Sequence, residues 1–449
     1  MERAARLAGL ELAPDTDVTV EGDDPVLPTP FHLGAGVSAA LALLGQESDR
    51  IWQARGGRAQ ALSIDVRHAV ASLMSYHLLR LPGLEQRVIP VVTGIHECGD
   101  GRYILLHGSF DHTEGILDEL VLGAEATAED VAAACMRRGA FELEDALAAR
   151  GKCAVVCRSS DEWLAHPQGA LLATKPVVEV TRIGDAPPRP FPAGKRPLDG
   201  VRVLDLTRVL AGPTCARTLA EHGADVLHIA SPNLPTIPIF EMDTGHGKRQ
   251  AYLDLDSPAE AEALRALIAD ADVFSQGFQH RSLERRGFGA EDLARMRPGI
   301  VYVSENAFGH EGPWQERPGW EQLAQCATGM AVAQGIERPA LTGPAQNDYT
   351  TGYFAALGAM TALRRRAVEG GSWLVRVSLS QTAMWYQRLG ADLDRTAAPG
   401  LGDVSGFLDE EETLYGPMTH LRPPLRMAET TPRWSIPSTP PGAGAPVWV

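Results

Sequence analysis

Apolar and polar residues alternate between strand-like and helix-like periods over the second half of the chain. Residues 201–206 alternate with period two and are rich in Val and Leu, which predicts a β-strand. Thr214–His222 has a helical pattern that ends at Gly223, and residues 224–229 form the next apolar run. A strand–helix–strand unit of this length predicts two parallel strands joined by a right-handed crossover.

The alternation continues through the following hundred residues. It predicts further strands at 251–255, 271–275 and 299–304, with helices at 258–269 and around 289–293. The expected fold class is therefore α/β, with a doubly wound parallel-sheet (Rossmann-like) domain. Such sheets bind ligands at the carboxyl ends of their strands. No Gly-x-Gly-x-x-Gly motif follows the first strand, which argues against an ordinary NAD or FAD site.

Two segments share one order of elements. An Ala-rich helix at 35–44 and another at 354–363 are each followed by a Gly turn, an alternating strand and a helix, over 57–69 and 370–383. The pattern is compatible with an internal duplication, although helix–Gly–strand–helix is also a common arrangement. A Pro-rich connector precedes residue 198, and we expect the Pro/Gly-rich residues after 397 to form an irregular arm.

Composition excludes several classes of protein. The net charge is −16 without a Lys/Arg run, which argues against a nucleic-acid partner. No apolar run approaches the roughly 20 residues that span a bilayer, so no membrane contact is expected. The first residues lack the apolar core of a signal peptide, and the six Cys are scattered, so we expect a cytoplasmic protein with reduced thiols. The sequence has no two Cys/His pairs with the spacing of a metal site, so no metal site is predicted.

Asp348 is the most informative single residue. It lies at the expected start of the second Ala-rich helix, after Thr342-Gly343-Pro344. An Asp at a helix start can cap the helix by accepting backbone N–H bonds. It can also be a nucleophilic carboxylate in the positive field of those N–H groups. Local sequence alone favours the cap.

Several motifs occur in a fixed order after residue 198. They are Val203-Leu204-Asp205-Leu206-Thr207-Arg208-Val209-Leu210-Ala211-Gly212-Pro213, Gly247-Lys248-Arg249, Leu253-Asp254-Leu255, Leu283-Glu284-Arg285-Arg286-Gly287-Phe288 and Phe308-Gly309-His310-Glu311-Gly312-Pro313-Trp314. This set resembles the family III CoA-transferases, the group of formyl-CoA transferase, carnitine CoA-transferase and alpha-methylacyl-CoA racemase. Asp100-Gly101-Arg102-Tyr103 and Ser160-Asp161-Glu162-Trp163 resemble segments that normally follow the catalytic domain, so the domain order looks rearranged and partly duplicated.

The resemblance implies four regions. Residues 1–190 would be an N-terminal partial copy that includes a smaller α+β domain, and 191–197 a Pro-rich linker. Residues 198–397 would be the catalytic domain, and 398–449 the C-terminal arm. Family members resemble interlocked rings of two chains, so we expect a homodimer.

The resemblance also implies an activity. CoA would pass from an acyl-CoA donor to a small carboxylic acid, with no permanently bound cofactor. Asp348 would be the nucleophile, forming an aspartyl anhydride and then a thioester, and Glu321 would assist or orient it.

The resemblance implies a set of CoA contacts, which are Val209, Ala211, Lys248, Arg249, Leu253, Arg285 and Arg286. The chain departs from the family at His228, Ala230 and Asp256, where basic or acidic pattern residues are replaced and positive charge is lost from the expected phosphate end. These departures leave a degenerate, non-catalytic relative as one alternative. The other alternative is an acyl-CoA racemase, which uses a His-Asp pair where this chain has Trp320-Glu321, and Trp cannot shuttle a proton.

Overall fold

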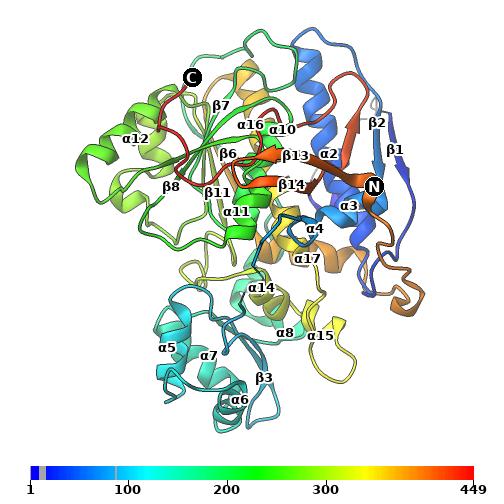
Figure 1. The fold of residues 1–449 in the computed structure, drawn as a ribbon, viewed down its shortest axis with the longest axis vertical. Helices are drawn as coiled ribbons and strands as arrows, with labels where there is room; N and C mark the ends of the chain where they lie inside the picture. The colour runs from blue at the N-terminus through cyan, green and yellow to red at the C-terminus, as the bar shows by residue number, and fades with distance from the viewer. Residues whose placement is uncertain (1, 10–16, 86–87) are drawn as a thin grey trace.

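The computed structural model describes residues 2–9, 17–85 and 88–449, so the predicted region 1–190 includes positions outside this description. A seven-stranded sheet forms the centre of the molecule (Figure 1). Its strands, in spatial order, are β6 (Glu179–Gly184), β12 (Ser372–Ser378), β11 (Val301–Asn306), β10 (Val273–Gln276), β7 (Arg202–Asp205), β8 (Asp225–Ala230) and β9 (Lys248–Tyr252). All neighbours are parallel except β6, which pairs antiparallel with β12.

Helices cover both faces of this sheet. Val203 and Val226 pack in one buried cluster with α10 (Ala211–Glu221) and α16 (Gln346–Glu369). The next residue along each strand belongs to a second cluster, with α12 (Pro258–Asp270) and α13 (Ala290–Met296). Successive strand side chains point to opposite faces, so burial on both faces explains the nearly continuous apolar runs of the sequence. The mixed α/β class with a large, mostly parallel sheet is therefore confirmed.

Two predicted boundaries are wrong. Helix α10 begins at Ala211, three residues before the predicted start at Thr214. Pro213 is compatible with the first turn because the first helical residues need no N–H donor. Strand β9 begins at Lys248, three residues before the predicted 251–255 segment. Lys248 is buried because it forms an ion pair with Asp205, and a polar residue at this position gave no sequence signal for a buried strand.

The N-terminal segment lies beside the main sheet. Its helix α2 (Leu33–Ala54) packs against α16, and β1 (Val18–Glu21) pairs parallel with β2 (Leu62–Asp65). The short helices here are α1 (Glu2–Leu7), α3 (Val66–Ser72) and α4 (Ser75–Leu78). Figure 1 shows this blue segment next to the central layer rather than as a detached unit.

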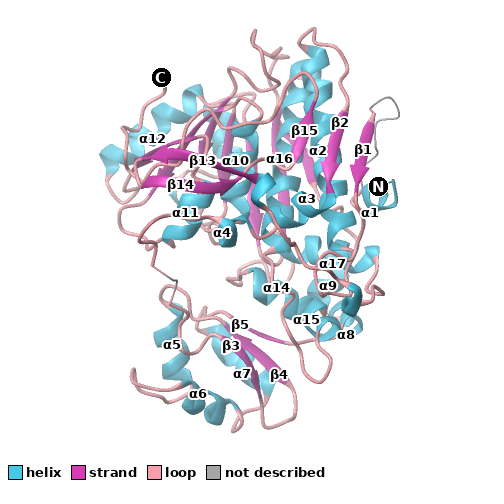
Figure 2. Cartoon of the chain, turned by 45° about the vertical axis from the view of Figure 1, so that its right-hand side comes forward, coloured by secondary structure: helices cyan, strands magenta, loops and turns pink. Residues whose placement is uncertain are grey.

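A second group of elements lies at one end of the molecule (Figure 2). Three antiparallel strands, β3 (Gly94–Glu97), β4 (Tyr103–Leu106) and β5 (Ala154–Val156), share a buried cluster with three helices, α5 (His112–Glu119), α6 (Ala128–Cys135) and α7 (Ala140–Ala149). Four helices connect this group to the main body, namely α8 (Ser160–Ala165), α9 (Pro167–Ala173), α14 (Glu321–Thr328) and α17 (Leu379–Leu389). Helix α15 (Met330–Gln334) follows α14.

The C-terminal arm is more ordered than predicted. Strands β13 (Leu408–Thr413) and β14 (Gly416–Leu421) form a hairpin, and β15 (Leu425–Met427) adds to β2. The hairpin packs on α4 and on α11 (Pro238–Thr244) through a small buried cluster that includes Leu79, Met242 and Met418. The Pro/Gly content of the whole arm concealed this local alternation. In the described ranges, no helix combines the length and the apolar character that a membrane crossing requires.

Gly352 permits the close approach of α16 to α10. A Cβ atom at this position would lie 2.6 Å from the carbonyl oxygen of Ala211 and 2.6 Å from Thr214 Cβ. We predict that Gly352→Ala lowers the free energy of unfolding by about 1 to 3 kcal/mol, because overpacking against backbone outweighs the gain of roughly 1 kcal/mol in helix propensity. Urea denaturation measures the change. Gly406→Ala is the control, since its Cβ meets nothing within 4 Å, and equal effects of both substitutions would contradict the packing argument.

Candidate active site

A cleft of about 510 Å³ opens at the carboxyl ends of the central strands. Leu206 and Val209 follow β7, Gly277 follows β10, and Ala307 follows β11. Between β7 and β10 the strand order reverses, because β8 and β9 extend to one side of β7 and the later strands to the other. Such reversal points are the usual ligand sites of open parallel sheets.

Asp348 lines this cleft and is 7% exposed. It lies in the first turn of α16, where the helix dipole favours an anion. The helix has Ala345 at its N-cap position and no side-chain cap bond of its own. The local interpretation of Asp348 as the cap is therefore wrong, and its carboxylate is available to the cleft.

Glu321 takes over the capping role. Its Oε2 accepts the backbone N–H of Asp348 at 2.8 Å, and its Oε1 accepts the side-chain amides of Asn347 at 2.9 Å and Gln325 at 2.8 Å. Burial raises the pKa of Glu321 to about 7, although these three donors favour its ionised form. The sequence-predicted pair of Asp348 and Glu321 is thus brought together, with Glu321 holding the start of α16.

A third carboxylate, Glu305, was missed in the sequence analysis. It lines the cleft after β11 and accepts the backbone N–H of Gly212 at the start of α10. Cβ atoms at Gly212 or Gly277 would lie 2.9 Å and 2.3 Å from Glu305 Oε1, so two glycines make room for it. The sequence did offer a signal for Glu305, because it is a charged residue directly after the predicted strand at 299–304, where ligand-binding residues of such sheets lie.

The three carboxylates influence one another. Burial raises the pKa of Glu305 to about 8. Burial raises the pKa of Asp348, and the negative charges of Glu321 and Glu305 raise it further. Carboxyl groups that interact this strongly do not titrate independently. At neutral pH the three groups together therefore hold protons that three isolated carboxyl groups in water would have lost.

Three of the predicted CoA contacts line the cleft, namely Val209, Ala211 and Arg286. Val209 has φ = 74°, a left-handed conformation that a β-branched residue rarely adopts. Backbone strain of this kind is concentrated at functional sites. Arg286 forms an ion pair of 2.6 Å with Asp256, which also lines the cleft.

The other four predicted contacts lie elsewhere. Lys248 is 2% exposed and its ammonium donates to Asp205 at 2.8 Å and to the Pro213 carbonyl at 2.9 Å. Arg249 donates to Asp225 and to the Val447 carbonyl. Leu253 is part of the core, and Arg285 is exposed and bonds to backbone carbonyls of the preceding turn. These cations are therefore committed to the fold or face solvent.

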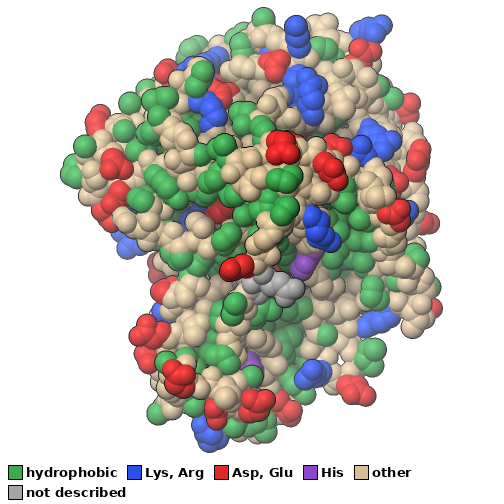
Figure 3. Space-filling model, viewed as in Figure 1, with side chains coloured by type: hydrophobic (Ala, Val, Ile, Leu, Met, Phe, Trp, Pro, Cys, Tyr) green, Lys and Arg blue, Asp and Glu red, His purple; other side chains and the backbone are tan. Residues whose placement is uncertain are grey.

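Two further arginines line the cleft that the sequence did not single out. Arg208 lies over the Phe110 ring at 4.8 Å and donates to the Pro235 carbonyl. Arg317 lies over Trp314 at 4.1 Å. His228, one of the departures from the family pattern, is buried and bonded to Thr207 and Gln250, so it does not face a ligand. Acidic and basic side chains are interspersed on the face shown in Figure 3.

Comparisons with known proteins identify the family of the chain. Residues 198–398 match the model of CoA-transferase family III. The chain is 30% identical to acetyl-coenzyme A transferase nodX of Hypoxylon pulicicidum, over 83% of this chain and 72% of that protein. It is 32% identical to an acyl-CoA transferase of Gibberella moniliformis, over 81% of this chain and 72% of that one. Formyl-CoA:oxalate CoA-transferase of Afipia carboxidovorans is 34% identical over 47% of this chain and 53% of its own length.

The large, mostly parallel sheet with a carboxylate-lined cleft at its strand ends is that of an α/β protein, and the relatives identify it as a CoA-transferase. The chain belongs to CoA-transferase family III.

We predict that Glu305→Gln stabilises the fold in a pH-dependent way. Because the pKa of Glu305 is raised in the folded state, its favourable contribution is complete below the unfolded value and is lost as pH rises through about 8. Gln does not ionise, so the variant should match the wild type at about pH 5 and exceed it by about 1 to 3 kcal/mol at about pH 8.5. Urea denaturation at both pH values measures this difference. The exposed Glu412→Gln is the control, and a Glu305→Gln effect that is equal at both pH values would contradict the prediction.

Proposed function

We propose that the chain transfers CoA from an acyl-CoA donor to a small carboxylic acid, with Asp348 as the nucleophile. The observation that carries this proposal is the Asp348 carboxylate, which lies in the cleft at the start of α16 without a capping role. The names of the relatives, which are transferases of acyl-CoA compounds, support the substrate class.

The covalent steps balance without a cofactor. A carboxylate oxygen of Asp348 attacks the acyl carbon, the C–S bond breaks, and CoA leaves as a thiolate, which produces a mixed anhydride. The thiolate then attacks the Asp348 carbonyl and releases the donor acid, leaving an aspartyl CoA thioester. The acceptor carboxylate attacks that thioester and expels the thiolate, which finally takes the acceptor acyl group and restores Asp348. Each step replaces a difficult transfer by an easier one.

The surroundings of Asp348 support these steps. The oxyanions that form on attack need preorganised N–H donors, and the Gly212 N–H at the start of α10 is directed at the cleft, where Glu305 now accepts it. Asp348 must be ionised to attack. Burial and the charges of Glu321 and Glu305 raise the pKa of Asp348, which opposes ionisation. The helix dipole of α16 favours the charge, and a proton held by Glu321 or Glu305 removes that neighbour's repulsion.

No observation favours racemisation over transfer. His310 donates to or accepts from Ser304 at 2.9 Å, and burial lowers its pKa to about 3, so it stays neutral. Trp320 occupies the position at which the racemase pattern has a His, and it stacks on His107 at 4.6 Å. Transfer therefore remains the proposal.

We also propose that the chain consists of two unequal family copies. The strand order β9-β8-β7-β10-β11-β12 supports a doubly wound Rossmann-like sheet in the second copy, residues 198–397. The sequence α2–β2–α3 repeats the order α16–β12–α17, and the two long helices pack on each other. Residues 1–190 would include the smaller domain, 191–197 the linker and 398–449 the arm. A cytoplasmic homodimer remains the expected form, and light scattering of the purified chain tests the dimer.

We predict that the wild type forms a covalent adduct on Asp348. Incubation with acetyl-CoA and then hydroxylamine should convert the activated carboxyl to a hydroxamate, which intact mass and peptide mapping detect. Asp348→Asn should form none and should lose transferase activity by on the order of 10³-fold or more. Asp185→Asn, at a fully exposed position, is the matched control. An equal adduct on Asp348→Asn would show that the nucleophile is a different residue.

We predict that Asp256 weakens CoA binding through Arg286. Its carboxylate holds the guanidinium at 2.6 Å and repels phosphate. Asp256→Asn should tighten CoA by about 3-fold, and Arg286→Ala should weaken it by about 10-fold, because a charge-assisted bond contributes roughly 1.5 kcal/mol. Calorimetric titration with CoA measures both. Arg285→Ala, which does not line the cleft, should change the affinity by less than about 2-fold. Equal losses for Arg285→Ala and Arg286→Ala would contradict the assignment.

A further inference from the structure

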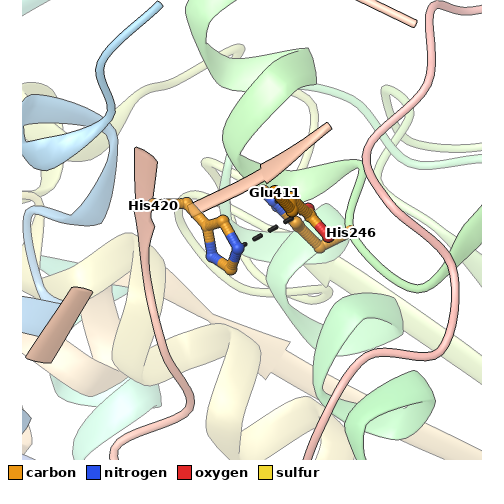
Figure 4. Close-up of side chains that lie close together, drawn as sticks. All are labelled: His246, Glu411 and His420. Carbon is orange, nitrogen blue, oxygen red and sulfur yellow. Dashed lines mark ion pairs between the residues drawn. The ribbon is translucent and has the colours of Figure 1, made fainter. Parts of the chain in front are cut away.

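Two imidazoles and one carboxylate converge outside the cleft, where the C-terminal hairpin meets the main body (Figure 4). His246 lies in the turn between α11 and β9, Glu411 lies on β13, and His420 lies on β14. Their ligand atoms all lie within 4.8 Å of one another. None of the three residues lines the cleft, so this cluster is separate from the candidate active site.

Backbone carbonyls fix the tautomers of both rings. Nδ1 of His246 lies 2.9 Å from the Asp243 carbonyl oxygen, and Nδ1 of His420 lies 3.2 Å from the Leu421 carbonyl oxygen. A carbonyl oxygen only accepts hydrogen bonds, so each Nδ1 carries the hydrogen. Each neutral ring therefore directs the lone pair of Nε2 at the remaining partner.

That partner is the Glu411 carboxylate. Its Oε1 lies 3.1 Å from His246 Nε2 and 3.5 Å from His420 Nε2. His246 is 2% exposed at its side chain, and neither its Nε2 nor Glu411 Oε1 has a hydrogen-bond partner among the described residues. Two buried imidazole lone pairs and a partly buried carboxylate oxygen that face one another repel unless a metal ion or a proton lies between them.

The geometry suits a four-coordinate divalent metal. Zn–N and Zn–O bonds of about 2.0 to 2.1 Å place neighbouring ligand atoms of a tetrahedron roughly 3.3 Å apart. The two measured separations, 3.1 and 3.5 Å, bracket that value. Carbonyls that bond Nδ1 are the usual outer partners of metal-binding His, and the Ser438 N–H holds the Glu411 carboxylate. Trp434 stands 5.0 and 5.7 Å from the two imidazoles and adds an apolar wall.

We propose that His246, Glu411 and His420 bind one Zn²⁺ ion, with water at the fourth position. The ion would fasten the β13–β14 hairpin to the turn between α11 and β9. That turn begins beside Asp243, whose carboxylate accepts the Tyr349 hydroxyl at 2.9 Å. Tyr349 follows Asp348, so the ion would also stabilise the support of the nucleophile. Sequence spacing predicted no metal site, because the three ligands come from separate segments.

Metal binding to the full chain tests this proposal. The purified protein is stripped with a chelator, dialysed, and titrated with Zn²⁺ by calorimetry and with Co²⁺ by visible absorption. We expect one ion per chain, d–d bands of four-coordinate Co²⁺, and a rise in Tm of several degrees with Zn²⁺. His246→Gln, His420→Gln and Glu411→Gln should each weaken binding by roughly 100-fold. His32→Gln removes a partly exposed imidazole beside Asp392 and should leave binding unchanged.

Glu411→Gln separates ligand loss from misfolding. The Gln amide can donate to a ring Nε2, so the stripped variant should be at least as stable as the stripped wild type while it no longer gains stability from Zn²⁺. Absence of saturable one-to-one binding by the wild type would overturn the proposal, whatever the variants do. Equal binding by the wild type and all three cluster variants would also overturn it, because the ion would then be held by other side chains.

Discussion

The hydrogen bond from the Asp348 backbone N–H to Glu321 is the interaction on which the site depends. It satisfies a buried donor at the start of α16, which would otherwise require a cap from the helix itself. Because the cap comes from α14, the Asp348 side chain can face the cleft. The same bond places a second carboxylate beside Asp348, so its pKa is raised by burial and by that neighbour. Positioning and charge repulsion are two consequences of one contact.

The start of α16 is held from three other directions. Gly352 lets the helix approach α10 closely, as the short Cβ distances to Ala211 and Thr214 show. The Tyr349 hydroxyl donates to Asp243, and the Ser75 hydroxyl of the N-terminal segment lies within hydrogen-bond distance of both groups. The N-terminal segment is thus part of the structure that orients Asp348. Its removal would unpair buried polar groups, which costs more than the loss of an ordinary surface contact.

Prediction from the sequence was most successful where the local period of apolar residues alone determines whether a segment is a strand or a helix. The strands of the parallel sheet and most of its helices follow from runs such as 201–206, because burial on both faces leaves a local apolar signature. It failed where a charge depends on a distant partner. Lys248 was expected to meet CoA, yet it is paired with Asp205 inside the sheet. The cluster of His246, Glu411 and His420 is assembled from separate segments, so no spacing in the sequence indicates it.

The N-terminal segment shows why one chain has one candidate nucleophile. Helix α2 corresponds in order to α16, and the residues just before it, Thr29 to His32, include no carboxylate. Its first turn is instead met by Asp24, whose two oxygens accept the N–H groups of Gly34 at 2.9 Å and Ala35 at 2.8 Å. Both helices therefore receive a carboxylate cap from outside their own first turn. Only α16 carries a second carboxylate inside that turn, and no capping requirement explains this additional carboxylate, which distinguishes the helix start with the proposed nucleophile from that of α2.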